Sequence, residues 1–289
     1  MGATATTVDE QIALLKSRGM VIDIDVDKAK EILLDIGYYR LGFYWHCFEC
    51  DNDHNLVANT KFTDVVSLYY LDVDLRELLL KYIYRIEVHF RTQVVYWVSN
   101  AHIHSPTWFV DNKVVLASYI AGFYTFYTDD FKRNNKPIDK HHKKYINDKY
   151  APAWKTIEFM TFGGCLKLFR SLKDDALKQQ ISDSYHLNDL EVFDNFIQTI
   201  VYVRNMCSHG GVLYDLKQPK GIRKIPGKQY KFRNQHSLDA KIKVIRYILS
   251  KISVNREAEM KIKLDNLFSN FQNNNNIENI IKNNINYTF

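Results

Sequence analysis

An arginine and a histidine five residues apart, Arg204 and His209, are the residues of this sequence best suited to chemistry. Such a pair suits cleavage of RNA without a metal, in which a ribose 2′-oxygen attacks the adjacent phosphorus. The histidine would take a proton from that oxygen or give one to the departing 5′-oxygen. The arginine would hold the phosphate and stabilise the charge that develops on it.

Both residues fall at the end of a predicted helix, residues 189–208, which Asn188 can cap and which Gly210 and Gly211 should end. Arg204 lies on the apolar stripe of this helix, so its guanidinium must pair with an acid or open into a cleft that binds an anion. His209 lies about 140° further round the helix. The two side chains converge only if the last turn loosens or a second copy of the chain contributes one of them. A core ion pair for the arginine, with a histidine that only satisfies the helix end, remains an alternative.

Glu87 is the only acid between Leu78 and Val110, in an apolar-rich segment predicted to be helical. It precedes Arg91 by four residues, the favourable order for an ion pair on a helix. We expect Glu87 to orient a cation of the site, either Arg204 or Arg91. The alternative is a simple pair on the helix surface.

Basic residues gather in two stretches that favour contact with RNA. Residues 132–149 hold seven lysines and arginines, two histidines and two acids, and residues 216–238 hold seven basic residues and no acid. Cations interleaved with aromatic rings suit a phosphate backbone and stacked bases. We expect the second stretch to bind RNA, although two solvated loops would explain the same pattern. Its basic residues are Lys217, Lys220, Arg223, Lys224, Lys228, Lys231 and Arg233.

The elements that must position these residues are predicted to be helices. Glycine and proline are absent from residues 43–105, 165–209 and 228–289, which favours long helices over short strands joined by turns. Apolar residues recur every three or four positions over 63–99. The fold class is therefore predicted to be all-α. A shorter helix, closed near Gly37, is expected within 26–39, and further helices are expected at 163–172, 237–250 and 256–271. The asparagine-rich segment 272–289 is expected to fray or form a marginal helix.

The composition excludes several classes of protein. The chain has 289 residues, of which 46% are hydrophobic and 25% charged, with a net charge of +6. These values are typical of a globular protein rather than a disordered one. No apolar run is long enough to span a membrane, and the N-terminus does not read as a secretory signal. We therefore expect a cytoplasmic protein, with an N-terminal helical segment (1–62), a core domain (63–255) and a C-terminal helical, asparagine-rich tail (256–289).

Cysteine usage indicates neither a disulfide scaffold nor a zinc site. Cys47 and Cys50 have histidines at positions 46 and 54 nearby, but no second cysteine pair follows in the sequence. A tetrahedral zinc site needs four converging ligands. We expect buried structural thiols, no metal and no cofactor.

The sequence resembles the abortive-infection family of AbiD/AbiF type, and Arg204 to His209 resembles the Arg-x(4–6)-His motif of HEPN ribonucleases, including the asparagine, Asn205, after the arginine. The blocks that carry the resemblance appear in family order and are Gln11–Gly19, Ile36–Leu41, Leu71–Arg76, Arg85–Thr92, Pro152–Trp154, Thr161–Gly163 and Arg204–His209. After His209 the sequence departs from the pattern, since Gly210 and Gly211 stand where relatives keep a further arginine.

The resemblance implies a HEPN-type helical bundle with an additional N-terminal helical segment. It also implies a toxin-like endoribonuclease that acts in antiphage defence, with RNA as substrate. Arg204 and His209 would be catalytic, Asn205 would assist by hydrogen bonding, and a homodimer would build one site from two motifs. Some relatives are associated with a small non-coding RNA, so the resemblance leaves open such an RNA as a further partner. Two other functions remain open: a catalytically silent RNA-binding regulator or sensor, and an interaction protein whose Arg-His pair stabilises a dimer.

Overall fold

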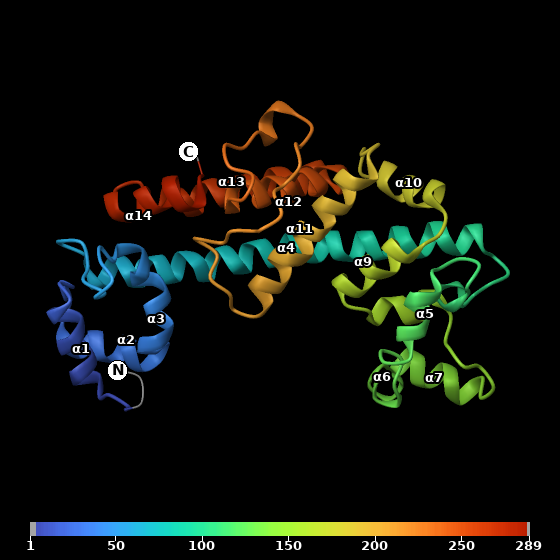
Figure 1. The fold of residues 1–289 in the computed structure, drawn as a ribbon, viewed down its shortest axis with the longest axis horizontal. Coiled ribbons are helices and arrows are strands. Elements are labelled where there is room, and N and C mark those ends of the chain that lie inside the picture. Colours follow the sequence, from blue (N-terminus) through green and yellow to red (C-terminus); the bar gives the residue numbers. More distant parts are fainter. Residues whose placement is uncertain (1–3, 288–289) are drawn as a thin grey trace.

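A single helix of 40 residues, α4 (Phe62–Ala101), is the spine of the molecule (Figure 1). The computed structural model describes residues 4–287. The helix predicted over 63–99 is confirmed, and the positions of its apolar repeat are buried through Val94; they are Leu68, Leu75, Leu79, Tyr82, Ile86, Phe90 and Val94. Trp97 is half-buried because Val98, one position further on, faces the core instead. The apolar repeat therefore placed the buried face correctly except at its last step.

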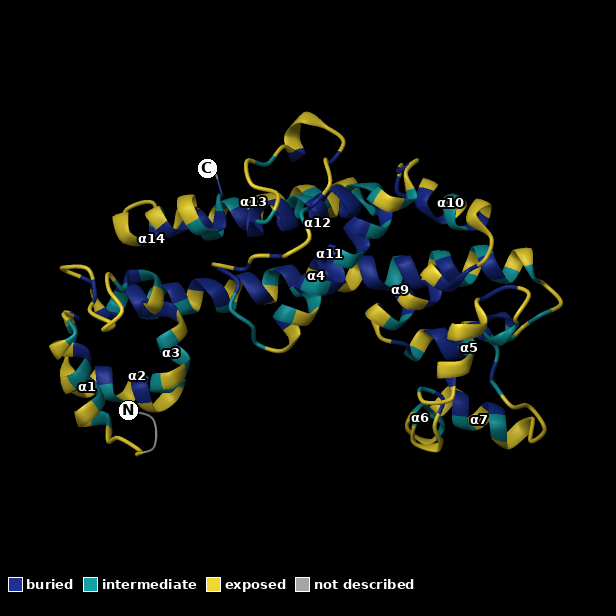
Figure 2. Ribbon diagram, viewed as in Figure 1, coloured by how far each residue is buried: buried dark blue, intermediate teal, exposed yellow. Residues whose placement is uncertain are grey.

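Three further helices pack on α4 and build the core with it. They are α11 (Leu190–Ser208), α12 (Leu238–Ile252) and α13 (Val254–Ser269). Buried residues line their facing sides in Figure 2. The expected domain boundaries fall beside the first residues of α4 and α13. Because α13 packs along both α4 and α12, the C-terminal helical segment shares its core with the rest of the chain.

The remaining helices group at the two ends of α4, so that the molecule has the outline of an arch in Figure 1. Among residues 4–287 there are isolated bridges but no strand, so the all-α prediction is confirmed. One end carries α1 (Val8–Ser17), α2 (Val26–Ile36) and α3 (Tyr38–Trp45). The other end carries α5 (Ala117–Phe123), α6 (Asp129–Asn134), α7 (Lys136–Lys144), α8 (Ala153–Thr156), α9 (Phe162–Ser171) and α10 (Asp175–Asp183).

One helix cap differs from the prediction and one helix end agrees with it. Asp189, not Asn188, caps α11, since its carboxylate accepts the backbone N–H groups of Glu191 at 2.8 Å and Val192 at 3.2 Å. The helix expected within 26–39 ends at Gly37 as predicted, because Gly37 has φ +91°, outside the helical region; a separate helix, α3, starts at the next residue. A side chain-to-backbone bond, and a backbone angle that glycine adopts readily, thus set these boundaries.

The asparagine-rich C-terminal segment is docked rather than frayed. Helix α14 (Asn275–Ile280) packs on α4 and is followed by a π-helical turn through Ile285. Ile277, Ile281 and Ile285 are fully buried. The side chains of Asn274 and Asn276 each donate to Asp64, at 2.6 and 2.7 Å. Packing against the start of α4 therefore orders a segment whose composition alone predicted little structure. Residues 288–289, at the end of the predicted tail, lie outside the described residues.

One buried lysine holds both ends of the long basic loop between α11 and α12. Lys241 is fully buried in α12, and its Nζ donates to the carbonyls of Leu216 at 3.0 Å, His236 at 2.7 Å and Ser237 at 3.1 Å. Burial lowers the pKa of this ammonium to about 8. Both ends of the loop are thus joined by hydrogen bonds to a single side chain.

Replacing this lysine should loosen the loop. The substitution Lys241→Met leaves the Leu216 and His236 carbonyls without their buried donor, so we expect a loss of about 3 kcal/mol in the free energy of unfolding. Urea denaturation at pH 7 measures it. Lys220→Met, an exposed position on the same loop, is the control and should change stability by less than about 0.5 kcal/mol. Equal stability of the two variants would contradict this role.

Candidate active site

Arg204 sits on α11 against the buried carboxylate of Glu87 on α4. Its Nε lies 3.6 Å from Glu87 Oε2, and its Nη1 donates to the Asn205 side-chain oxygen at 3.3 Å. The other Glu87 oxygen accepts from Arg91 Nη2 at 3.0 Å. One acid therefore contacts both of the cations that the sequence offered as alternatives. The side chain of Arg204 is 31% exposed, so it is held at the surface rather than sealed in the core.

Arg91 holds this cluster in place from its buried side. Its side chain is 9% exposed, and its Nη2 also donates to the carbonyl of Met160 at 3.1 Å. Because Arg91 is bound on both sides, it fixes Glu87 and does not reach solvent freely. The arrangement leaves Arg204 as the cation of the cluster that can meet an anion from outside.

His209 is exposed at the C-cap of α11. The helix ends as a Schellman motif, in which Gly210 donates to Cys207 O at 3.3 Å and Gly211 donates to Met206 O at 2.7 Å. Gly210 has φ +66°, as the predicted glycine stop requires. The N–H of His209 still bonds to Asn205 O at 3.0 Å. The last turn is therefore regular, and the angle of about 140° between Arg204 and His209 round the helix persists.

A buried carboxylate on α4 holds the segment that follows His209. Asp72 is 1% exposed and accepts the backbone N–H groups of Leu213 at 2.8 Å and Tyr214 at 2.9 Å. It also accepts from Tyr44 Oη at 3.0 Å and from Arg76 Nη1 at 3.1 Å. Burial raises the pKa of this carboxyl, and these four donors oppose the rise.

Arg76 and Arg40 complete the surroundings of the α11 terminus. Arg76 Nη1 donates to the carbonyl of Gly211 at 3.2 Å. Arg40 Nη2 lies 3.9 Å from where a Cβ on Gly210 would stand. Both arginines and Asp72 belong to blocks of the sequence that carried the family resemblance, but sequence reasoning gave them no role. An acid and an arginine four residues apart on the buried stripe of α4 were the signal for Asp72 and Arg76.

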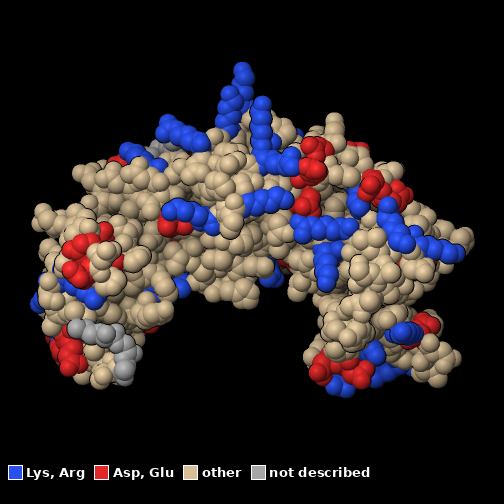
Figure 3. Space-filling view, in the orientation of Figure 1, with Lys and Arg blue, Asp and Glu red and all other residues tan. Residues whose placement is uncertain are grey.

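The predicted RNA-binding residues do not gather at Arg204 and His209. Lys217, Lys220, Arg223, Lys224, Lys228, Lys231 and Arg233 are all exposed. Their loop (orange in Figure 1) projects from the convex side of the arch, whereas α11 ends on the concave side. Figure 3 shows basic side chains standing out along that convex edge. Tyr230 is buried against Tyr247, with ring centroids 5.6 Å apart, so it is unavailable for stacking on a base.

The other basic stretch, residues 132–149 over α6 and α7, is neutralised in part by its own acids. Lys132 pairs with Asp129 at 3.0 Å, and Lys143 pairs with Asp139 at 2.6 Å. Acidic and basic side chains alternate over this end of the molecule in Figure 3. It therefore presents a mixed surface rather than a basic patch.

A family model described as Abi-like protein matches residues 31–215, well over half of the chain. The chain belongs to the Abi-like protein family. The matched range includes Asp72, Glu87 and the whole of α11, and ends before the basic loop. No curated protein matches the chain. No solved structure matches it either. No helix among residues 4–287 is long and apolar enough to cross a membrane.

A substitution tests how much the buried hydrogen bonds of Asp72 stabilise this Abi-like protein. The substitution Asp72→Asn removes the charge opposite Arg76 and turns one acceptor into a donor that faces donors. We expect a loss of about 3 kcal/mol in the free energy of unfolding, measured by urea denaturation.

The matched control for this test is Asp74→Asn, two residues along α4 and exposed. It should change stability by less than about 0.5 kcal/mol. Similar stabilities for the two variants would show that the buried contacts of Asp72 contribute little.

Proposed function

We propose that this Abi-like protein is a metal-independent endoribonuclease of HEPN type that acts in abortive-infection defence against phage. The observation that carries the proposal is the pairing of Arg204 with the buried Glu87 carboxylate, five residues before an exposed His209. The pair fixes the guanidinium without enclosing it, which is what binding of a phosphate from solvent requires.

The reaction uses groups that the chain itself supplies. The ribose 2′-oxygen attacks phosphorus and loses its proton, and the 5′-oxygen leaves and gains one. The products are a 2′,3′-cyclic phosphate and a 5′-hydroxyl end. His209 transfers one of these protons, and Arg204 stabilises the additional negative charge on the phosphorane. Asn205 supports Arg204 through its side-chain oxygen, and Arg40 supplies a second positive charge near Gly210.

A homodimer completes the site in this proposal. The regular last turn of α11 points Arg204 and His209 in directions about 140° apart. One chain therefore aims the two side chains at different places. A second copy, with its α11 end facing the first, would bring the His209 of one chain to the Arg204 of the other.

Removing the histidine should abolish cleavage without unfolding the protein. For His209→Ala we expect at least about 100-fold slower cleavage of labelled RNA in the presence of a chelator, because a proton transfer is lost. The side chain is exposed, so circular dichroism and stability should match the wild type. His104→Ala, another exposed histidine, is the control. Undiminished cleavage by His209→Ala would exclude the proposed role.

Mixing two inactive variants tests the shared site. Arg204→Ala and His209→Ala should each be inactive alone, whereas chains refolded together should regain part of the cleavage rate, because some dimers then contain one intact Arg-His combination. Failure to regain activity, with mixed dimers shown to form, would contradict a site built from two chains.

The second candidate function is a catalytically silent RNA-binding regulator or sensor, for which a small non-coding RNA is a candidate ligand. The separation of the basic loop from the end of α11 favours it, because RNA held on the convex edge need not reach His209. In this case the wild-type protein would bind RNA and leave it intact.

Charge reversal on the loop separates these roles. Lys220→Glu combined with Lys224→Glu should weaken RNA binding and make it less dependent on salt, since fewer counterions are released. Filter binding at several salt concentrations measures both effects. Lys251→Glu on α12, outside the loop, is the control. If RNA affinity is unchanged in the double variant, the loop does not bind RNA.

A further inference from the structure

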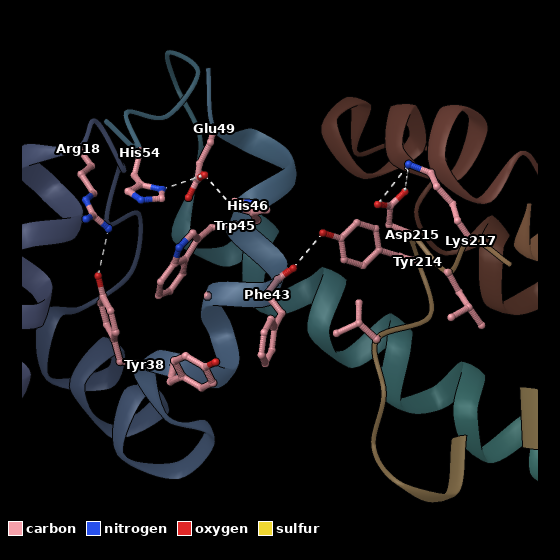
Figure 4. Close-up of a pocket in the computed structure, with 14 residues that line it drawn as sticks. Arg18, Tyr38, Phe43, Trp45, His46, Glu49, His54, Tyr214, Asp215 and Lys217 are labelled. Carbon is pink, nitrogen blue, oxygen red and sulfur yellow. Dashed lines mark hydrogen bonds and ion pairs between the residues drawn. The ribbon is translucent and has the colours of Figure 1, made fainter. Parts of the chain in front are cut away.

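Two histidines and a glutamate meet in the wall of a pocket beside α3. His46 Nδ1 lies 2.6 Å from Glu49 Oε2, and His54 Nδ1 lies 3.1 Å from the same oxygen. One ligand atom from each residue lies within 4.8 Å of the other two. Figure 4 shows the imidazoles approaching the carboxylate from opposite sides. Three groups that commonly bind metals therefore converge within the reach of one ion.

The local backbone holds these groups together without a metal. The Asp51 carboxylate accepts the backbone N–H groups of Asp53 at 2.9 Å and Asn55 at 3.0 Å, and the Asn55 side-chain amide at 2.7 Å. The turn closed by these bonds brings His54 back beside Glu49. His54 itself has φ +63°, in the left-handed region. The cluster is thus a formed feature of the turn rather than a chance approach of long side chains.

The two cysteines nearby do not take part. Cys47 Sγ donates to the carbonyl of Tyr44 at 3.3 Å, and Cys50 Sγ donates to the carbonyl of Asn55 at 3.2 Å. Cys50 is exposed, so the expectation of a buried thiol is wrong at this position. The donor set is two nitrogens and one oxygen, with no sulfur.

We propose that His46, Glu49 and His54 bind a divalent transition-metal ion, with zinc the best match to these donors. Imidazole and carboxylate ligands suit zinc, at about 2.0–2.2 Å from the ion, which sets tetrahedral ligand atoms about 3.3 Å apart. The separations of 2.6 and 3.1 Å need only small side-chain rotations to reach that value. Glu49, whose side chain is 11% exposed, is the fixed inner ligand, and the more exposed imidazoles close on the ion from outside.

The site leaves one coordination position open toward the pocket. All three residues line a pocket of about 760 Å³, whose other walls include Tyr38 and Tyr214. Three protein ligands with a free fourth position describe zinc that carries a water or an anionic ligand group, rather than a closed structural site. Arg18 also lines the pocket and would favour an anion there, whereas Lys217 in the same wall pairs with Asp215 at 3.1 Å. The site shares no residue with the Arg204–His209 cluster.

Zinc binding to the full chain tests the proposal without any RNA. Protein stripped with a chelator and dialysed is titrated with zinc chloride against a chromogenic zinc indicator. We expect one bound ion per chain. His46→Ala and His54→Asn should each weaken zinc binding more than 10-fold. Loss of a group that only supports a ligand typically lowers metal affinity at least about 10-fold, and loss of a ligand itself should lower it further. Asparagine is chosen at position 54 because it tolerates positive φ.

Matched variants identify the donors. Cys50→Ala and His104→Ala should keep the wild-type affinity, and circular dichroism should show that all variants fold. The cobalt-substituted protein should lack a sulfur-to-cobalt charge-transfer band. Two outcomes would overturn the proposal: wild-type protein that binds zinc no better than the combined His46→Ala, His54→Asn variant, or binding that is lost in Cys50→Ala and retained in His54→Asn. Neither outcome depends on RNA cleavage, so the zinc proposal can be overturned without affecting the proposed ribonuclease function, and the reverse also holds.

Discussion

The buried carboxylate of Asp72 is the interaction on which the rest of the arrangement depends. An ionised group away from water is costly unless hydrogen bonds replace its hydration, and four donors from three parts of the chain do so here. These donors tie α3 and the segment after α11 to the spine helix α4. Fifteen residues along α4, Glu87 does the same for Arg204 with its two oxygens. Two acids on α4 thus position the C-terminal end of α11: Glu87 holds Arg204 before the helix end, and Asp72 holds the backbone that follows it.

The sequence predicted the parts of the fold that local signals determine. The apolar repeat of α4 and the glycine stop after His209 are readable because periodicity and backbone angles act within a few residues. The stop at Gly37 was predicted, but a glycine near a helix end does not reveal that a second helix starts at once. The docking of α14 was missed because it depends on Asp64, some 210 residues away in sequence. Such contacts leave no trace in a local pattern.

The site shows the same division. An isolated acid in an apolar helix, Glu87, pointed to its arginine partners because a buried charge must be paired. The charge of the basic loop predicted that its residues are exposed, but not which side of the molecule they occupy. From the sequence, Cys47 and Cys50 were considered as metal ligands and Glu49 was not, because a single glutamate is common in any sequence. The spacing of Glu49 between His46 and His54 was the signal, and only the turn around Asp51 shows that the three meet.

The continuity of α4 has a mechanical consequence. A helix of 40 residues is about 60 Å long and stiff. The helices at its two ends are therefore held at a fixed distance from each other. The hollow of the arch in Figure 3 has a width that depends on the straightness of this one rod. A kink near its middle, between Asp72 and Glu87, would alter what fits between the two ends and would also shift these two acids relative to each other.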